Sequence, residues 1–238
     1  MPPLDRGHTS PMPPSADPLI ALIPAYEEGP RIAAVVRAAA AHLPVVVIDD
    51  GSTDDTAAAA EAAGATVLRQ VLNAGKGAAL RAGFRHALDA GVDAVVTLDA
   101  DGQHDPDEIP RCVAAFEAAR PELVIGQRDF SRMPPVRRLS NTLGGAALAL
   151  ALGRGVPDNQ SGYRLIGRTL MRALLDSDES GFEFEVEMIA RCIALGLPVS
   201  SVPIATIYDG APSHIRPLHH LREFARVTRK ARRIARGR

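Results

Sequence analysis

Two aspartates, Asp99 and Asp101, directly follow an apolar run at residues 94–98 that has the composition of a buried strand. In extended backbone, residues two apart project to the same side, so both carboxylates reach one site. Neighbouring carboxylates repel each other unless a cation lies between them. Oxygen ligands without cysteine or histidine at metal-binding spacing favour Mg²⁺ or Mn²⁺ over zinc. The pair therefore predicts a site for Mg²⁺ or Mn²⁺, and a solvated acidic loop is the alternative.

Acidic residues also follow two earlier apolar runs with strand character. Glu27 comes shortly after the run at residues 19–24, and Asp49 and Asp50 close the run that starts at residue 44. In open α/β sheets, ligands bind at the edge where the carboxyl ends of the parallel strands converge. We therefore expect these acids to cluster with the aspartate pair, and a chance grouping of acids in polar loops is the alternative.

The residue types at this edge suit a nucleotide. Tyr26 offers a ring that can stack on a base, and the Glu27 carboxylate can accept the N–H donors of that base. Asp50 is placed to accept a hydrogen bond from the base or the ribose. Lys76 opens a helical segment after the third strand, where it is either a phosphate contact or part of a structural turn.

Three common motifs do not match. An EF-hand loop counted from Asp99 requires glycine and glutamate where the chain has His104 and Pro110. The helix start at residues 73–77 fails the P-loop spacing, because Gln70 stands where the first glycine is required. No G-x-G-x-x-G motif occurs, so a Rossmann dehydrogenase is not expected.

Length and composition bound the class of protein. The 238 residues suit one large domain with appendages, and the net charge of −1 gives no general argument for nucleic acid, so no nucleic-acid partner is expected. The two cysteines, Cys112 and Cys192, imply no disulfide framework and favour a reducing cytosol. No apolar run reaches the ~18 residues of a membrane span. We therefore expect a cytoplasmic protein whose membrane contact, if any, is peripheral and on the cytoplasmic face.

Strand-like and helical segments alternate through the first half of the chain. The expected strands cover residues 19–24, 44–49, 66–70, 94–98 and 122–127, with helices at 30–42, 53–64, 76–90 and 106–119 between them. This alternation predicts an α/β fold with a mostly parallel sheet and helices on both faces. After Arg128 the pattern changes, and we expect an apolar helix at 138–152, a strand at 163–166, a helix at 183–195 and a strand at 199–208.

The two ends differ from the middle. Residues 1–17 are rich in proline and serine and predict a disordered leader, which leaves residues 18–214 as the folded domain. Residues 215–238 predict a basic amphipathic helix with Arg222, Arg226, Arg229, Lys230, Arg232, Arg233, Arg236 and Arg238 against a single Glu223. On an anionic membrane each basic residue contributes ~1 kcal/mol, and a solvated basic helix is the alternative.

Five motifs in this order resemble family 2 glycosyltransferases of the GT-A fold, and most closely the dolichyl- or polyprenyl-phosphate mannose or glucose synthases. The motifs are PAYEEG (24–29), VIDDGSTDDT (47–56), NAGKGAALRAG (73–83), LDADGQHDPDEIP (98–110) and DNQSGYR (158–164). The resemblance covers residues 19–214 and implies a Rossmann-like GT-A sheet that binds a nucleotide sugar.

The resemblance also implies roles for single residues. Asp99 and Asp101 form the D-x-D motif that holds a divalent metal on the donor diphosphate, which makes Asp101 a catalytic candidate, and Gln103 can complete the metal site. The nucleoside is held by the motif that matches Pro24, Ala25, Tyr26 and Glu27, together with Asp50. The implied reaction is inverting transfer of a hexose from GDP-mannose, or next from UDP-glucose, to a polyprenyl phosphate.

A polyprenyl phosphate is already an anion, so it needs cations to position it rather than a strong base. Arg128, Arg138 and Arg164 are the candidates, because planar guanidinium groups suit phosphate oxygens, and a solvated helix face is the alternative for Arg138. Many relatives carry an R-x-x-G-x-S-K-like loop. The matching loop here keeps Ser213 and has His214 in place of the lysine, a departure that bears on the acceptor's identity.

Two other functions stay open. Transfer to a soluble hydroxyl acceptor would require a base, for which Asp158 and Glu185 are the candidates, and the family has an acid near Glu185. A non-catalytic sugar-nucleotide-binding protein is the other alternative, although an intact D-x-D argues against it. A nucleotidyltransferase lacks support, because no glycine-rich basic loop follows the first strand.

Overall fold

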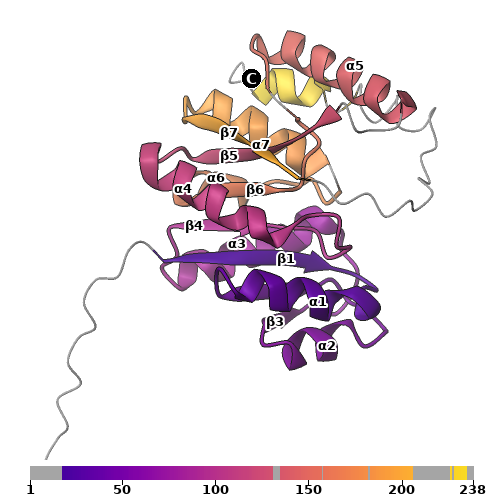
Figure 1. Cartoon of the computed structure of the whole chain (residues 1–238). Coiled ribbons are helices and arrows are strands. Elements are labelled where there is room, and N and C mark those ends of the chain that lie inside the picture. The colour runs from indigo at the N-terminus through magenta and orange to yellow at the C-terminus, as the bar shows by residue number, and fades with distance from the viewer. Residues whose placement is uncertain are drawn as a thin grey trace, which may run out of the picture.

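The structure is a computed structural model that describes residues 18–130, 135–156, 158–181, 183–205, 226 and 228–234. Across these residues, seven strands form one sheet in the order β3-β2-β1-β4-β6-β5-β7. The strands are β1 (Leu19–Ala25), β2 (Val45–Asp49), β3 (Thr66–Arg69), β4 (Ala94–Thr97), β5 (Leu123–Arg128), β6 (Arg164–Gly167) and β7 (Val199–Ile204). Only β6 runs antiparallel to its neighbours, β4 and β5. The expected mostly parallel sheet is confirmed (Figure 1).

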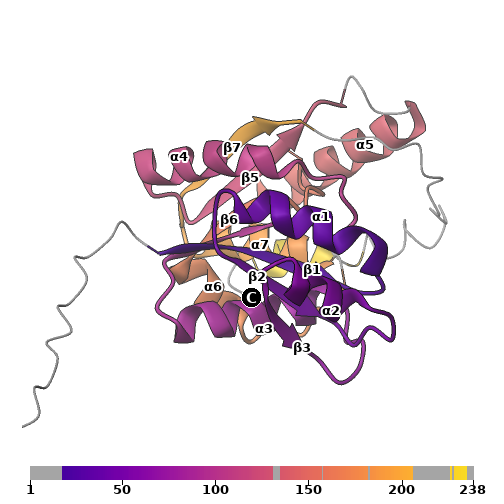
Figure 2. The same ribbon diagram turned by 60° about the horizontal axis from the view of Figure 1, so that its bottom comes forward.

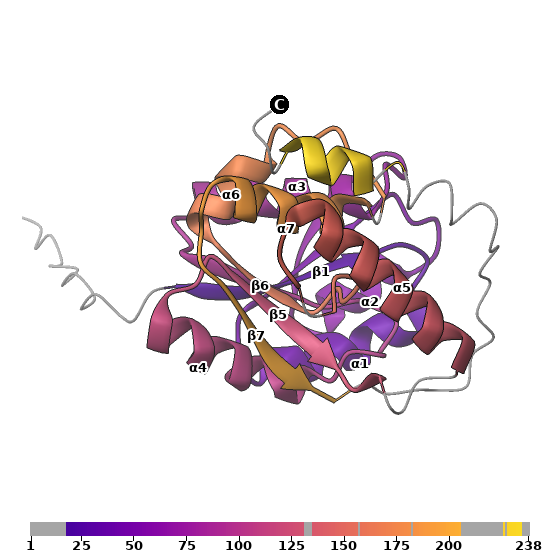
Figure 3. The same ribbon diagram turned by 90° about the horizontal axis from the view of Figure 1, so that it is seen from above.

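Helices cover both faces of the sheet, as expected. They are α1 (Gly29–Ala40), α2 (Thr56–Ala62), α3 (Lys76–Asp89), the 3-10 turn η1 (Pro106–Glu108), α4 (Ile109–Ala119), α5 (Pro135–Leu152), α6 (Arg168–Leu174) and α7 (Glu183–Ala194). One hydrophobic core joins the sheet to α1, α2 and α4, and a second joins it to α3, α6 and α7 (Figure 3). Helix α5 lies at the opposite end of the sheet from β3 (Figures 1 and 2).

The strands that carry the predicted acids are buried on both faces. On β1, the adjacent residues Leu22 and Ile23 belong to opposite cores, which is the pattern of a strand covered by helices on both sides. The parallel register pairs Ala25 with Asp49 and Leu22 with Thr97. Strands β1, β2 and β4 therefore end at the same edge of the sheet, and the loops that follow them meet there.

Two features of the second half differ from the sequence expectation. Helix α6 was not predicted, although Leu170, Met171 and Leu174 have helical spacing and are fully buried. It was missed because α6 follows β6 directly, with no turn residues between them to mark a boundary. Strand β7 ends at Ile204 and residue 205 is no longer in the strand, while residues 206–208 of the strand expected at 199–208 lie outside the described residues.

The described part of the C-terminal helix packs against α7. Its Ala231 is buried in the core that contains α7, and Lys230 Nζ lies 2.7 Å from Glu179 Oε1 and 2.9 Å from Glu187 Oε2. At least one of the predicted membrane-facing cations is therefore paired inside the fold. The predicted leader and the boundary near residue 214 lie outside the described residues. Among the described helices, none is long and apolar enough to cross a membrane.

Replacing Lys230 with methionine is expected to lower the free energy of unfolding by about 1 kcal/mol at pH 7, because the buried Glu187 then keeps only Arg191 as a charged partner. Burial raises the pKa of Glu187, but Lys230 and Arg191 lower it by more, so the folded-state pKa lies below the ordinary value. The difference in unfolding free energy between the unmodified chain and Lys230→Met should therefore have its full size above about pH 5. It should shrink as the pH falls through the folded-state pKa of Glu187.

Urea denaturation of both proteins across this pH range tests the expectation. Replacing the exposed Arg232 with methionine is the matched control, and it should change the stability much less. Equal losses in the two variants, or a loss that does not depend on pH, would contradict the proposed pairing.

Candidate active site

The loops after β1, β2 and β4 surround a cavity of about 340 Å³ together with the start of α3. Seven of the residues selected from the sequence line it: Pro24, Ala25, Tyr26, Asp50, Lys76, Asp99 and Asp101. The cavity lies at the carboxyl edge of the parallel strands, where α/β proteins bind their ligands. Asp50, Asp99 and Asp101 thus line one cavity as predicted, whereas the loop after β1 contributes Tyr26 and Glu28 in place of the predicted Glu27.

Lys76 joins two carboxylates inside this site. Its Nζ lies 2.5 Å from Asp99 Oδ1 and 2.7 Å from Glu185 Oε1, so α3, the loop after β4 and α7 meet at one ammonium group. Burial lowers the pKa of Lys76, but the charges of Asp99 and Glu185 raise it by more, to well above its ordinary value. Burial likewise raises the pKa of Asp99, whereas Lys76 holds it well below the usual range. Both groups are therefore charged at neutral pH.

His104 supports Asp99 from the other side and was not selected from the sequence as a site residue. Its Nδ1 accepts the Asp99 backbone N–H at 3.0 Å, and its Nε2 lies 3.6 Å from Asp99 Oδ2. The ring is 5% exposed and packs edge-on against Tyr163. Because Nδ1 accepts a hydrogen bond, a neutral ring carries its proton on Nε2, which faces Asp99. Its place five residues after Asp99, within the LDADGQHDPDEIP motif, was the available signal.

The aspartate pair fits a divalent cation. Among the described residues, no three histidine, cysteine, aspartate or glutamate side chains assemble a complete metal site. Asp99 and Asp101 line the same cavity, however, and Mg²⁺ is commonly held by one or two carboxylates plus substrate phosphates. Asp101 Oδ1 accepts the Gln103 N–H at 2.9 Å, which holds Gln103 beside the pair.

At the nucleoside side, the predicted carboxylates also hold the loops in place. The two oxygens of Asp50 accept the N–H groups of Ala74 and Gly75 at 2.9 and 2.8 Å, which fixes the start of α3. Gly75 has a φ of +92° and a Cβ there would lie 2.5 Å from the Ser180 carbonyl oxygen, so this position requires glycine. Tyr26 remains 46% exposed at the edge of the cavity.

Glu27 and Asp49 are not among the residues that line the cavity. Glu27 Oε1 accepts hydrogen bonds from the backbone N–H and the hydroxyl of Thr53, at 2.8 and 2.9 Å. Asp49 Oδ1 accepts the Ser52 N–H at 3.1 Å. Both carboxylates therefore order the turn after β2, and each retains lone pairs for a further donor.

Two acceptor-side candidates, Arg128 and Asp158, bind each other. Arg128 Nε and Nη2 donate to the two Asp158 oxygens, both at 2.7 Å, and the Arg128 backbone N–H donates to Oδ2 at 3.0 Å. Asp158 is 6% exposed and has a φ of +38°, an uncommon conformation for a residue other than glycine. The pair joins the end of β5 to the loop at residues 158–163.

Arg164 is 1% exposed and does not line the cavity. Its guanidinium donates to the backbone carbonyls of Asn159, Ser161 and Glu185, at 3.1, 2.8 and 2.5 Å. These contacts tie the DNQSGYR loop to the first turn of α7. Arg164 thus organises the backbone beside the site.

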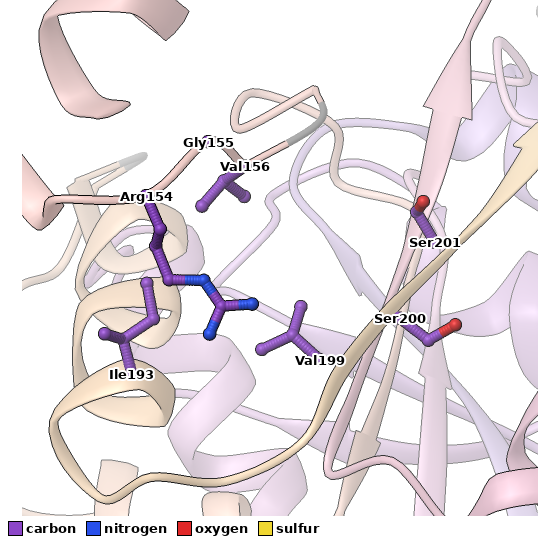
Figure 4. Close-up of a pocket in the computed structure, with 7 residues that line it drawn as sticks. All are labelled: Arg154, Gly155, Val156, Ile193, Val199, Ser200 and Ser201. Carbon is purple, nitrogen blue, oxygen red and sulfur yellow. The ribbon is translucent and has the colours of Figure 1, made fainter. Parts of the chain in front are cut away.

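The other acceptor-side candidates are dispersed or not described. Arg138 is exposed on the first half of α5. Ser213 and His214 lie outside the described residues. A second groove of about 270 Å³ lies between the end of α5, α7 and β7, with Arg154 between Ile193 and Val199 (Figure 4). None of the residues selected from the sequence lines this groove.

The sequence profile described as Glycosyl transferase family 2 matches residues 20–175. These residues include β1 to β6 and all of the cavity's lining residues. The resemblance drawn from the five motifs is therefore confirmed.

Two curated relatives that match this chain are named as transferases acting on lipid phosphates. The undecaprenyl-phosphate mannosyltransferase of Micrococcus luteus is 36% identical over 148 residues, which cover 59% of this chain and 60% of that protein. The UDP-N-acetylglucosamine–dolichyl-phosphate N-acetylglucosaminyltransferase of Methanococcus voltae is 33% identical over 143 residues, which cover 57% of each. The matches thus span about 60% of the length of these relatives.

A solved structure extends the likeness to nearly the whole fold. Glucosyl-3-phosphoglycerate synthase from Mycobacterium tuberculosis, crystallised with Mn²⁺, UDP and glucosyl-3-phosphoglycerate, superposes with a TM-score of 0.69. The superposition covers 94% of this chain and 81% of that one, at 24% sequence identity. This likeness confirms the expected GT-A fold.

Proposed function

The chain belongs to glycosyltransferase family 2, and we propose that it transfers a hexose from a nucleotide sugar to a polyprenyl phosphate with inversion of the anomeric centre. GDP-mannose is the favoured donor and UDP-glucose the next. The observation that carries the proposal is the single cavity that brings Asp99 and Asp101 together with Lys76 at the carboxyl edge of the sheet. Relatives that are named as polyprenyl- or dolichyl-phosphate transferases support the acceptor class.

The proposed donor lies across this cavity. Tyr26 at its edge offers a ring to the base, and the loop that Asp50 fixes brings Lys76 to the diphosphate. Asp99 and Asp101 would hold Mg²⁺ or Mn²⁺, which when bound supplies positive charge that stabilises the departing nucleoside diphosphate. The side chains that line the cavity orient the departing nucleoside diphosphate. Its negative charge then develops next to the Lys76 ammonium.

The pairing of Asp158 favours a phosphate acceptor over a hydroxyl. A hydroxyl nucleophile needs a base to take its proton, whereas a phosphate monoester is already an anion. Both oxygens of Asp158 accept hydrogen bonds from Arg128, and Glu185 contacts Lys76, so each candidate base already has a cationic partner. A carboxylate oxygen that already accepts a hydrogen bond from a cationic partner is less available to contact a substrate hydroxyl.

The exposed side of α5 suits the lipid chain of such an acceptor. One exposed ridge of the helix carries four residues spaced four apart: Arg138, Thr142, Ala146 and Leu150. This ridge therefore runs from a cationic side chain to an apolar one. Leu148 on the other side is buried in the core. The helix thus both packs on the fold and offers an apolar surface, and Leu150 is 87% exposed.

We place the protein at an anionic membrane surface, where its acceptor would reside. The exposed residues of the described C-terminal helix include Arg232 and Arg233, whereas Arg226 is exposed but pairs with Glu179 and Glu183. Basic residues near such a surface each contribute about 1 kcal/mol to binding. Sedimentation with vesicles that contain or lack anionic lipid would measure this attachment, which should weaken as salt is added.

The test of the function is transfer of label from radioactive GDP-mannose and UDP-glucose into organic-extractable product, with a short polyprenyl phosphate and Mn²⁺. Label in the lipid phase from one donor would support the proposal and identify that donor. Metal-dependent consumption of donor without lipid product would instead support a soluble hydroxyl acceptor. No consumption of any sugar nucleotide, together with measurable nucleotide binding, would support the non-catalytic alternative.

Replacing Leu150 with glutamate is expected to reduce transfer to polyprenyl phosphate by about tenfold, since contact of a leucine with an apolar chain is worth roughly 1.5 kcal/mol. Hydrolysis of the donor in the absence of acceptor should not change, because Leu150 lies outside the cavity. Leu195→Glu is the matched control, because Leu195 is also an exposed leucine and follows α7. Equal transfer by both variants would argue against α5 as the acceptor surface.

A further inference from the structure

The contacts of Lys76 differ in how easily they can be exchanged. The side chains of Lys76 and Asp99 are each 30% exposed, whereas the side chain of Glu185 is 7% exposed. The contact with Asp99 therefore faces the open cavity, and the contact with Glu185 lies behind it. A cation that enters the cavity reaches Asp99 first.

The local charge is not balanced by Lys76 alone. The single ammonium group of Lys76 faces three negatively charged carboxylates: Asp99, Asp101 and Glu185. Arg128, which lies nearby, is paired with Asp158. The Arg164 guanidinium, which donates to the Glu185 backbone carbonyl, adds a buried positive charge beside this cluster, and the carboxylates still outnumber the cations there. Because Lys76 lies against Asp99 Oδ1, its positive charge repels a metal that approaches this oxygen, and the repulsion falls if the ammonium moves away.

The surrounding backbone limits where the ammonium can go. A Cβ at Gly162 would lie 2.8 Å from Lys76 Nζ and 3.0 Å from Asp99 Oδ2, so that side of the pair is closed by backbone. The Gly77 N–H donates to the Ser180 carbonyl at 2.6 Å, which fixes the first turn of α3. The Lys76 side chain can thus turn only toward Glu185 or into the cavity.

We propose that Lys76 is an internal counter-ion that competes with the divalent cation for Asp99, and that Glu185 is the positioning residue that retains Lys76 when the metal binds. This inference rests on the proposed function, in which Asp99 and Asp101 hold the metal and the donor diphosphate occupies the cavity. The released ammonium then faces the diphosphate oxygens, so nucleotide and metal each favour binding of the other.

The proposal predicts opposite effects of two substitutions on the metal affinity of the free protein. Lys76→Met removes the competitor, so Mn²⁺ should bind about tenfold more tightly in the absence of nucleotide. Glu185→Gln leaves Asp99 as the only charged partner of Lys76, so Mn²⁺ should bind a few-fold more weakly than to the unmodified chain. A general loss of folding cannot produce changes of opposite sign.

The experiment titrates the full-length chain and its variants with Mn²⁺ and follows free Mn²⁺ by electron paramagnetic resonance, with and without GDP or UDP. In the unmodified chain, nucleoside diphosphate should tighten Mn²⁺ binding, and in Lys76→Met this coupling should be smaller, because only the direct contact between metal and phosphate remains. Lys230→Met removes a lysine from the C-terminal helix and should leave Mn²⁺ binding unchanged. Circular dichroism checks that each variant is folded.

The outcomes separate this inference from the proposed function. If Mn²⁺ binding requires Asp101 but Lys76→Met binds Mn²⁺ as the unmodified chain does or more weakly, the counter-ion role is wrong and the metal site stands. If Glu185→Gln tightens Mn²⁺ binding, the positioning role of Glu185 is wrong. If neither the unmodified chain nor any variant binds Mn²⁺ in an Asp101-dependent manner, with or without nucleotide, metal-dependent transfer fails together with the inference.

Discussion

Replacing Asp101 with alanine is expected to lower sugar transfer by about a thousandfold, since loss of charge stabilisation worth roughly 4 kcal/mol in the transition state corresponds to that factor. Asp101 lines the cavity beside Asp99, and without its carboxylate the site keeps one aspartate for the metal. The fold should tolerate the change, because the hydrogen bond that Asp101 accepts comes from Gln103 in the same loop. The rate of label transfer at saturating Mn²⁺ and donor measures the effect.

The matched control lies four residues further along the same loop. Asp105 Oδ1 accepts the Asp107 N–H and caps η1, so Asp105→Asn keeps the acceptor atom and removes only the charge. This variant should retain most of its activity. Activity of Asp101→Ala above about a tenth of the unmodified level, or an equal loss in both variants, would rule out a metal role for Asp101.

The position of the site followed from the sequence because it depends on topology. Acids that come directly after buried strands must lie at the carboxyl edge of a parallel sheet, whatever the details of the loops. Asp50, Asp99 and Asp101 therefore line one cavity, as expected from their places in the chain. The alternation of strands and helices likewise predicted the layers of the fold, since each apolar run between turn residues must be covered on both faces.

The partners of the site's charged side chains did not follow from the sequence. Arg128 and Asp158 were assigned to different roles, and the structure pairs them across thirty residues of chain. Glu185 reaches Lys76 from a segment 109 residues away. Such pairs depend on how helices dock on the sheet, and the local pattern of apolar and polar residues does not encode this. The antiparallel direction of β6 is a similar case, because a strand's composition is the same in either direction.

Replacing Arg164 with methionine is expected to lower the free energy of unfolding by about 3–5 kcal/mol, because a buried charged group that satisfies several partners is lost. Its guanidinium donates to three backbone carbonyls, and methionine would remove all three of these hydrogen bonds from a buried site. Burial lowers the pKa of Arg164, while Glu185 and Asp158 oppose that shift. Arg164→Lys keeps the charge but cannot span all three carbonyls, so we expect an intermediate loss of stability.

Arg168 provides the comparison for this prediction. Its guanidinium pairs with Asp93 and donates to the carbonyls of Gly91 and Val92, but its side chain is 32% exposed, so water can replace those bonds after substitution. Arg168→Met should therefore lower the free energy of unfolding by about 1 kcal/mol, measured by urea denaturation alongside Arg164→Met. An Arg164→Met protein that is as stable as the unmodified chain, yet inactive, would mean that Arg164 acts on the substrate. If Arg164→Met is unstable but its remaining folded fraction binds nucleotide normally, the role of Arg164 is to hold the backbone that supports the site.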